Sequence, residues 1–164
     1  MPRPSLRILS LAALAVLCGC SSSIGISTTV DPLVVFPREA TYVWDEAANS
    51  FPDEPRLDPL RLDTLLVEEV DRSFAERGYR RVAAEPADYR LAYEVRLNTR
   101  IEADHSRSLI IVWLNLVETA TGDLVWTGAA QTKLHVGLTE KERRERLDKA
   151  LDEVLKDFPP DQRG

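Results

Sequence analysis

Residues 89–97 read YRLAYEVRL, and this stretch decides the fold class. Its odd-numbered positions are apolar and its even-numbered positions are mostly polar. A period of two is typical of a β-strand that has one face on a core and the other facing solvent or a partner. The segment therefore predicts a half-buried strand, around which the rest of a sheet can be assembled.

Segments on both sides of this strand extend the predicted sheet. LIIVWLNLV, at 109–117, is apolar on both faces and indicates a central strand, and residues 124–136 alternate again. ETATGD, at 118–123, is typical of a turn, so we expect the two flanking strands to form an antiparallel hairpin. Residues 24–30 and 40–44 are rich in β-branched or aromatic residues and are predicted strands.

Two helices are predicted from their end signals. Asp58-Pro59 is a typical helix start, and Gly78 is well placed as the left-handed residue that ends that helix. A second helix begins at Thr139, where Glu142 three residues later completes a capping box. Its segment KERRERLDK, at 141–149, mixes both charge signs and predicts a solvated face with ion pairs.

The predicted order of elements is β-β-α-β-β-β-α, with residues 79–82 returning the chain to the sheet. This order places two helices on one face of a mostly antiparallel β-sheet, which is an α+β two-layer sandwich. The 164 residues suffice for one domain with a core. The formal net charge of −6 lacks the basic footprint of a nucleic-acid-binding protein, so no nucleic-acid partner is expected.

The N-terminus has the features of an export signal. Arg3 and Arg7 precede residues 8–16, which are apolar apart from Ser10. This run is too short to span a bilayer but is typical of a secretory signal. The only cysteines, Cys18 and Cys20, are separated by one residue, so a bridge between them would be strained and two thiols make no structural zinc site.

The sequence LCGC, at 17–20, resembles the bacterial lipobox. The resemblance implies that signal peptidase II cuts between Gly19 and Cys20, and that Cys20 carries a diacylglycerol and an N-acyl lipid. Because several acyl chains anchor a protein stably, the membrane is an expected partner. Ser21 at the next position resembles the outer-membrane sorting pattern, which implies a lipid-anchored location on the periplasmic face of the outer membrane.

This resemblance also divides the chain. Residues 1–19 are the expected signal peptide, which is removed, and residues 20–23 are the lipidated cysteine with a short tether. Residues 24–160 form the single expected domain, and residues 161–164 are a C-terminal tail.

The body of the chain resembles the DUF4136 lipoproteins of Gram-negative bacteria. Besides the lipobox, three pieces carry the resemblance: ATYVW at 40–44, ERGYRRV at 76–82 followed by ADYRLAYEV, and ETATGDLVWTGAAQTKL at 118–134. Many members carry a Gly/Tyr/Trp-rich insertion between the third and fourth strands, where this chain has only NTRIEADHSRS, at 98–108. The family name records an unknown function, so the resemblance implies no catalytic residue.

The two histidines do not predict a catalytic or metal site. His105 lies beside Glu102 and Asp104, but no second His or Cys completes a metal site, so this connection is predicted to be a solvated loop. The serines near it have no nucleophile-elbow sequence, and we expect no enzyme activity. His135 lies on the polar phase of its strand and is expected to be exposed or to face a partner.

One strand face is a candidate interaction surface. If the face of Trp113 points away from the helices, then Leu109, Ile111 and Trp113 form an apolar strip that would bind a partner or a lipid. The leading hypothesis is a non-catalytic interaction or accessory module of the cell envelope, whose partner is an unidentified envelope protein or lipid. The alternatives are a lipid-binding or transport-accessory lipoprotein, which would shield an acyl chain on the open sheet face, and, third, a hydrolase. No cofactor is expected beyond the lipid on Cys20.

Overall fold

The structure is a computed structural model that describes residues 24–159, apart from residues 56, 58–60, 103–104 and 136. Within the described residues the chain forms six strands and two helices. In chain order these are β1 (Gly25–Val30), β2 (Ala40–Trp44), α1 (Leu62–Glu76), β3 (Tyr79–Arg81), β4 (Tyr89–Glu102), β5 (His105–Glu118), β6 (Leu124–Lys133) and α2 (Glu140–Val154).

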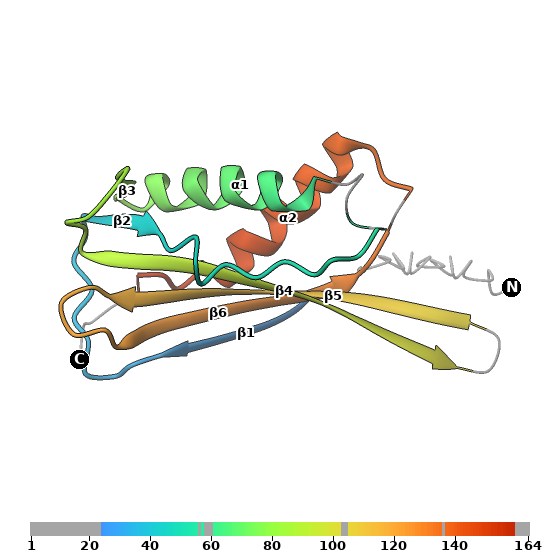
Figure 1. The fold of residues 1–164 in the computed structure, drawn as a ribbon, viewed down its shortest axis with the longest axis horizontal. Coiled ribbons are helices and arrows are strands. Elements are labelled where there is room, and N and C mark those ends of the chain that lie inside the picture. The colour runs from blue at the N-terminus through green and yellow to red at the C-terminus, as the bar shows by residue number, and fades with distance from the viewer. Residues whose placement is uncertain (1–23, 56, 58–60, 103–104, 136, 160–164) are drawn as a thin grey trace, which may run out of the picture.

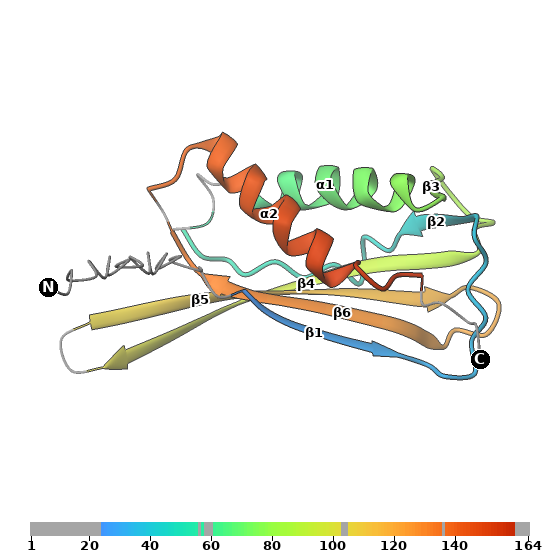
Figure 2. The same cartoon turned by 180° about the vertical axis from the view of Figure 1, so that it is seen from behind.

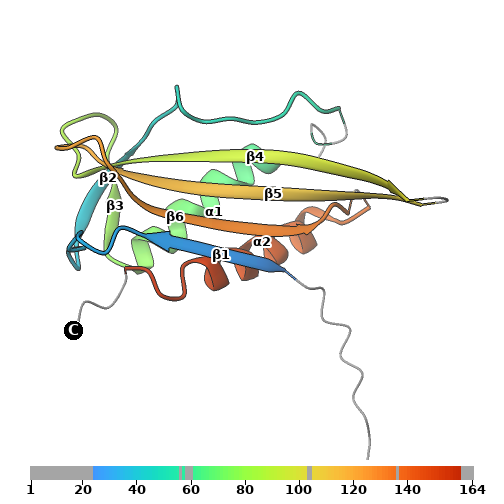
Figure 3. The ribbon, with the colours of Figure 1, turned by 90° about the horizontal axis from the view of Figure 1, so that it is seen from below.

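The six strands form one sheet in the order β1-β6-β5-β4-β2-β3. The four strands β1, β6, β5 and β4 are antiparallel to their neighbours, whereas β2 joins β4 in parallel and β3 joins β2 in parallel. Both helices lie on one face of this sheet (Figures 1 and 3). The predicted α+β two-layer sandwich is therefore confirmed, as is the hairpin of β5 and β6, and the return segment after α1 adds the short strand β3.

The loop predicted at residues 98–108 is wrong, because β4 and β5 continue through most of it. Their pairing runs as far as Glu102 opposite His105, and the hydroxyl oxygens of Thr99 and Ser108 lie 3.1 Å apart across the two strands. Pairing of β5 with β6 stops at Leu109, so beyond that residue the hairpin is two-stranded and projects past the sheet (Figure 1). An arm with no core beneath it needs no apolar face, and its sequence therefore lacks the period-two signal.

The capping residues in the sequence predicted some helix ends correctly and one wrongly. Helix α1 begins at Leu62, so the predicted start at Asp58 is wrong. Its N-cap residue, Arg61, has a left-handed conformation and no side-chain hydrogen bond caps the helix. Asp58 and Pro59 themselves lie outside the described residues. The end at Gly78 is confirmed by its φ of 87°. The capping box of Thr139 is also confirmed, because its backbone N–H donates to the Glu142 carboxylate at 2.8 Å.

Aromatic side chains pack between the sheet and the two helices near the C-terminal ends of α1 and α2. Phe158, which follows α2, packs its ring 5.2 Å from Phe74 of α1 and 4.9 Å from Trp126 of β6, measured between centroids. Trp126 is 2% exposed and is part of the core. Asp71 of α1 accepts hydrogen bonds from the Tyr42 hydroxyl at 2.6 Å and from the indole N–H of Trp44, which fixes α1 over β2.

Candidate functional site

Helix α2 lies obliquely over the sheet, close to it at one end and farther away at the other (Figure 2). At the close end Gly128 of β6 permits the approach, since a Cβ atom there would lie 2.4 Å from a methyl carbon of Val154. Toward the N-terminal end of α2 the two layers separate and leave a cavity of about 380 Å³. This volume falls within the range of about 300–1,000 Å³ that is typical of ligand pockets.

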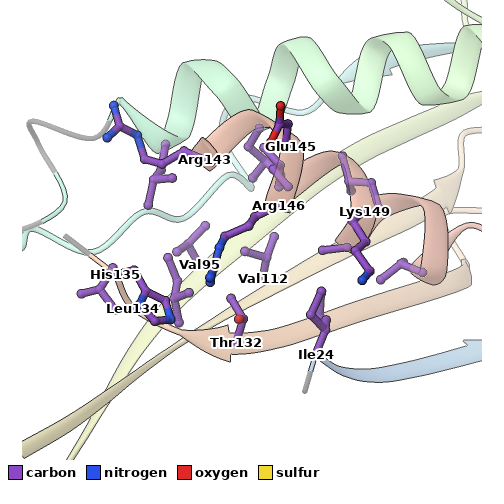
Figure 4. Close-up of a pocket in the computed structure, with 18 of the residues that line it drawn as sticks. Ile24, Val95, Val112, Thr132, Leu134, His135, Arg143, Glu145, Arg146 and Lys149 are labelled. Atoms are coloured by element: carbon purple, nitrogen blue, oxygen red, sulfur yellow. The ribbon is translucent and has the colours of Figure 1, made fainter. Parts of the chain in front are cut away.

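Aliphatic side chains make up most of the wall of this cavity, which we call the α2 cavity. The sheet contributes Val95, Ile110, Val112, Leu114 and Ala130. The two helices contribute Leu62, Leu66, Leu147, Ala150, Leu151 and Val154. Ile24, which leads into β1, lies at one side of it (Figure 4). Such a wall favours an apolar ligand, because removing apolar surface from water is the main source of binding energy in a site of this kind.

The charged side chains of the α2 cavity lie around its edge together with His135, and we call this set the charged rim. Its members are Lys133, His135, Glu142, Arg143, Glu145, Arg146 and Lys149. The acidic members are both engaged, since the Glu142 carboxylate accepts hydrogen bonds from Thr139 and Glu145 forms an ion pair with Lys141 at 3.7 Å. The rim has four cationic side chains, Lys133, Arg143, Arg146 and Lys149, against two carboxylates, so its net charge is positive.

Arg146 differs from the other arginine of the rim. The Arg143 guanidinium donates a hydrogen bond to the Leu138 carbonyl, and Figure 4 shows this side chain turned away from the strands. The half-buried Arg146 side chain extends from α2 over the cavity toward the sheet (Figure 4). It makes no hydrogen bond or ion pair with another residue that the structure describes. Its charge is still felt by Glu142, whose pKa is lowered by the hydrogen bonds from the Thr139 backbone and hydroxyl and then by Arg146.

The neighbouring charges of α2 hold that helix against α1. Glu69 of α1 is 4% exposed, and its carboxylate accepts hydrogen bonds from Arg144 at 2.6 Å and from Arg72 at 2.9 Å. Arg72 also pairs with Asp148 of α2. The segment predicted to be a solvated face is thus divided: Arg144 and Asp148 join the two helices, whereas Arg146 and Lys149 belong to the charged rim.

The predicted apolar strip lies on the face of the sheet that the helices leave uncovered, which we call the open face. Leu109, Ile111 and Trp113 are half-buried there, and the guanidinium carbon of Arg96 lies 5.3 Å from the centre of the Trp113 ring. This distance is within the range of a cation–π contact. The α2 cavity lies on the other side of β5, over Val112, and so not on the open sheet face where the lipid-binding alternative places an acyl chain.

Other predicted residues are placed as follows. Gly19 and Cys20 lie outside the described residues, as does the side chain of His105, so cleavage and lipid attachment stay predictions. His135 is exposed, as expected, and lies at the charged rim. In the part of the chain that the structure describes, no three His, Cys, Asp or Glu side chains are grouped to hold a metal ion, and no helix has the length and apolarity needed to cross a bilayer.

The sequence reading missed the α2 cavity altogether. One available signal was the position of Arg146, which lies one helical turn before Ala150 and beside Leu147, on the edge of the buried stripe of α2. A charged side chain at that place is either turned to solvent or placed over a space between the layers. The helical pattern alone does not separate these two cases.

Comparison with solved structures finds one that shares this fold and others that resemble it less closely. A PDZ domain protein from Parabacteroides distasonis superposes with a TM-score of 0.54 at 16% identity, over 85% of this chain and 36% of that one. The PelC dodecamer from Paraburkholderia phytofirmans gives 0.49 at 13% identity, covering 81% of this chain and 95% of that one. Lipoprotein GNA1162 from Neisseria meningitidis gives 0.48 at 15% identity, with coverages of 72% and 99%. At 16% identity, the similarity to the PDZ domain protein concerns the fold alone. No curated protein matches the sequence.

A family comparison is more specific than these structural ones. Residues 26–160 match the family described as "Domain of unknown function (DUF4136)". The match spans most of the chain and includes all of the strands and helices named above except the first residue of β1. It confirms the resemblance seen in ATYVW, ERGYRRV and the β5–β6 segment, and the chain belongs to the DUF4136 family.

Proposed function

We propose that this protein is a non-catalytic, lipid-anchored protein of the cell envelope that binds the acyl chain of a lipid in the α2 cavity. The observation that carries the proposal is the cavity itself, which is about 380 Å³ in volume and lined mainly by aliphatic side chains from the sheet and both helices. Side chains such as Val112 and Leu147 offer an acyl chain only apolar contact. The side chains of the charged rim lie at the edge of the cavity, where a lipid head group would bind.

The anchor is the second part of the proposal. The lipobox supports a lipid on Cys20 and a location at the periplasmic face of the outer membrane. A chain spans at most about 3.6 Å per residue, so the four-residue tether from an anchor on Cys20 to Ile24, which lines the cavity, would reach no farther than about 14 Å. The anchor would thus hold the α2 cavity near the membrane surface, where lipids that leave the bilayer are available.

Filling the cavity tests the proposal. Val112→Phe places a larger side chain in the cavity, whereas Ile111→Phe introduces the same residue type on the open face of the same strand. We expect Val112→Phe to weaken binding of oleate and of oleyl alcohol by about tenfold or more, and Ile111→Phe to change it little. The measurement is displacement of N-phenyl-1-naphthylamine, an uncharged fluorescent probe, from the chain that starts at residue 20 and carries Cys20→Ser. That chain contains every described helix and strand.

Thermal unfolding supplies the control for folding. A side chain that fills existing space does not overpack the core, so Val112→Phe should unfold at the native temperature or above it. If neither ligand displaces the probe from the native sequence, or if Val112→Phe binds both as well as the native protein does, the acyl-chain proposal is wrong.

A second function is supported by the open face. Trp113 is half-buried there under Arg96, and exposed aromatic and arginine side chains are frequent in protein–protein interfaces. On this reading the domain is an interaction module for another envelope protein. The same two variants separate the functions, since a protein partner on the open face would be lost with Ile111→Phe and retained with Val112→Phe.

A further inference from the structure

We propose that Arg146 receives the head group of the ligand, and that the preferred ligand of the α2 cavity is a long-chain fatty carboxylate. In this arrangement the single acyl chain fills the cavity and its carboxylate pairs with the Arg146 guanidinium. The inference rests on the proposed function and specifies the ligand class of the same site.

The first argument is the position of Arg146. Its side chain is half-buried, lies over the cavity (Figure 4), and has no hydrogen-bond or ion-pair partner among the described residues. Every other arginine of α2 has a partner: Arg143 donates to the Leu138 carbonyl, and Arg144 pairs with Glu68 and Glu69. A guanidinium presents a planar pair of donors that matches a carboxylate, so Arg146 has an unused site for an anion.

The second argument is the balance of charge around that site. Lys133 and Lys149 add two more cations to the charged rim, while the carboxylates of Glu142 and Glu145 are held by Thr139 and Lys141. The rim therefore has a net positive charge, which favours an anionic ligand over a neutral one. An anion placed beside apolar walls interacts with Arg146 more strongly than in open water, because the local dielectric constant is lower.

The third argument is size. The cavity volume of about 380 Å³ lies near the lower end of the range of about 300–1,000 Å³ for ligand pockets. This space suits one acyl chain better than two. The Thr132 hydroxyl also lines the cavity, on the sheet side opposite α2, and offers a second donor to a carboxylate.

The test compares two ligands of equal length that differ in charge. Oleate and oleyl alcohol are titrated against the uncharged probe N-phenyl-1-naphthylamine on the chain from residue 20 with Cys20→Ser. On the native sequence we expect oleate to bind about tenfold more tightly than oleyl alcohol. Arg146→Gln should abolish this preference by weakening oleate alone, and Arg146→Lys should retain part of it. Arg80→Gln is the matched control, because it removes an exposed arginine from β3, at the sheet edge away from β1 and β6.

Several results would overturn the inference while leaving the proposed function intact. One is equal affinity of the native protein for oleate and oleyl alcohol, and another is an oleate affinity that Arg146→Gln leaves unchanged. Tighter binding of a diacyl phosphatidylglycerol than of oleate would contradict the single-chain assignment. Failure of both oleate and oleyl alcohol to bind would instead contradict the proposed function itself.

Discussion

Two glycines show how the same backbone conformation has different consequences at different places. Gly78 and Gly122 both have positive φ, 87° and 79°. At Gly78 a Cβ atom would lie 2.3 Å from the Arg38 carbonyl oxygen, whereas at Gly122 it would meet nothing within 4 Å. The two positions therefore separate the cost of a left-handed conformation from the cost of a steric clash.

We expect Gly78→Ala to lower the free energy of unfolding by about 2–4 kcal/mol, because conformational strain and a clash with backbone both act there. Gly122→Ala has only the conformational strain and should cost about 1–2 kcal/mol. Urea denaturation of both variants measures the difference. Equal losses would show that the Arg38 segment moves aside and that the close approach at Gly78 is not a constraint.

At the scale of single residues, the sequence predicted positions whose signal is local. Gly78 ends a helix and Thr139 begins one because the groups they satisfy belong to adjacent residues. Arg146 was not predicted to be functional, because what distinguishes it is the space between α2 and the sheet. Arg144, two residues earlier, has the same chemistry and a structural role, as its partners on α1 show.

At the scale of elements, α2 is held by contacts of two kinds. Its C-terminal half packs on the sheet through Val154 at Gly128, and its N-terminal half is held to α1 by the pairs around Glu69. The ion pairs thus fix the half of α2 that lies away from the sheet. This arrangement accompanies the α2 cavity, which lies between that half of the helix and the strands.

The ion pairs of Glu69 with Arg144 and Arg72, which we call the clamp, depend on pH through the pKa of Glu69. Burial acts to raise the pKa of Glu69, but the hydrogen bonds and charges of Arg144 and Arg72 outweigh burial and hold the pKa below its ordinary value of 4.5. A carboxyl whose pKa is lower in the folded state stabilises the fold above its unfolded pKa, and this stabilisation is lost as the pH falls through the folded value. Stability should therefore fall below about pH 4.5.

We expect Glu69→Gln to lower the free energy of unfolding at pH 7 by about 1–3 kcal/mol, since charged hydrogen bonds at a buried position are lost. The variant should also lose less stability than the native protein between neutral and acid pH. Urea denaturation at several pH values measures both effects. Glu68→Gln is the control, because its pair with Arg144 is exposed and should contribute less than about 1 kcal/mol. Parallel pH profiles for Glu69→Gln and the native protein would contradict the role of the clamp.

At the scale of the whole molecule, one end collects the features that carry the proposals. β1 begins beside the α2 cavity, where Ile24 lines it, and β6 ends there with Lys133 at the charged rim. The β4–β5 hairpin projects toward the same end (Figures 1 and 2). A lipid on Cys20 would place this end of the domain toward the membrane.

The anchor itself is tested by Cys20→Ala. We expect this variant to take up no radiolabelled palmitate and to leave the outer-membrane fraction, either as an uncleaved precursor or as a soluble periplasmic protein. Cys18→Ala is the matched control, because on the lipobox assignment that cysteine would be removed with the signal peptide, and its loss should leave labelling unchanged. A Cys20→Ala protein that still carries label would show that the lipobox assignment is wrong.

The sequence by itself determined the class of fold, since hydrophobic periods and helix caps are properties of neighbouring residues. They predicted the half-buried strand around residues 89–97, the hairpin of β5 and β6, and the two helices on one face. The two-stranded arm beyond Leu109 was missed because pairing without a core leaves no apolar period.

Only the tertiary structure decided where a ligand can bind. A period shows which side of an element is apolar, but it does not show how closely another element covers that side. The α2 cavity exists because Val154 of α2 packs on Gly128 of the sheet, while the other half of α2 is held to α1 by the pair of Arg144 with Glu69. These contacts join residues far apart in the chain, so their combined geometry, and the space left beneath Arg146, is a property of the folded molecule.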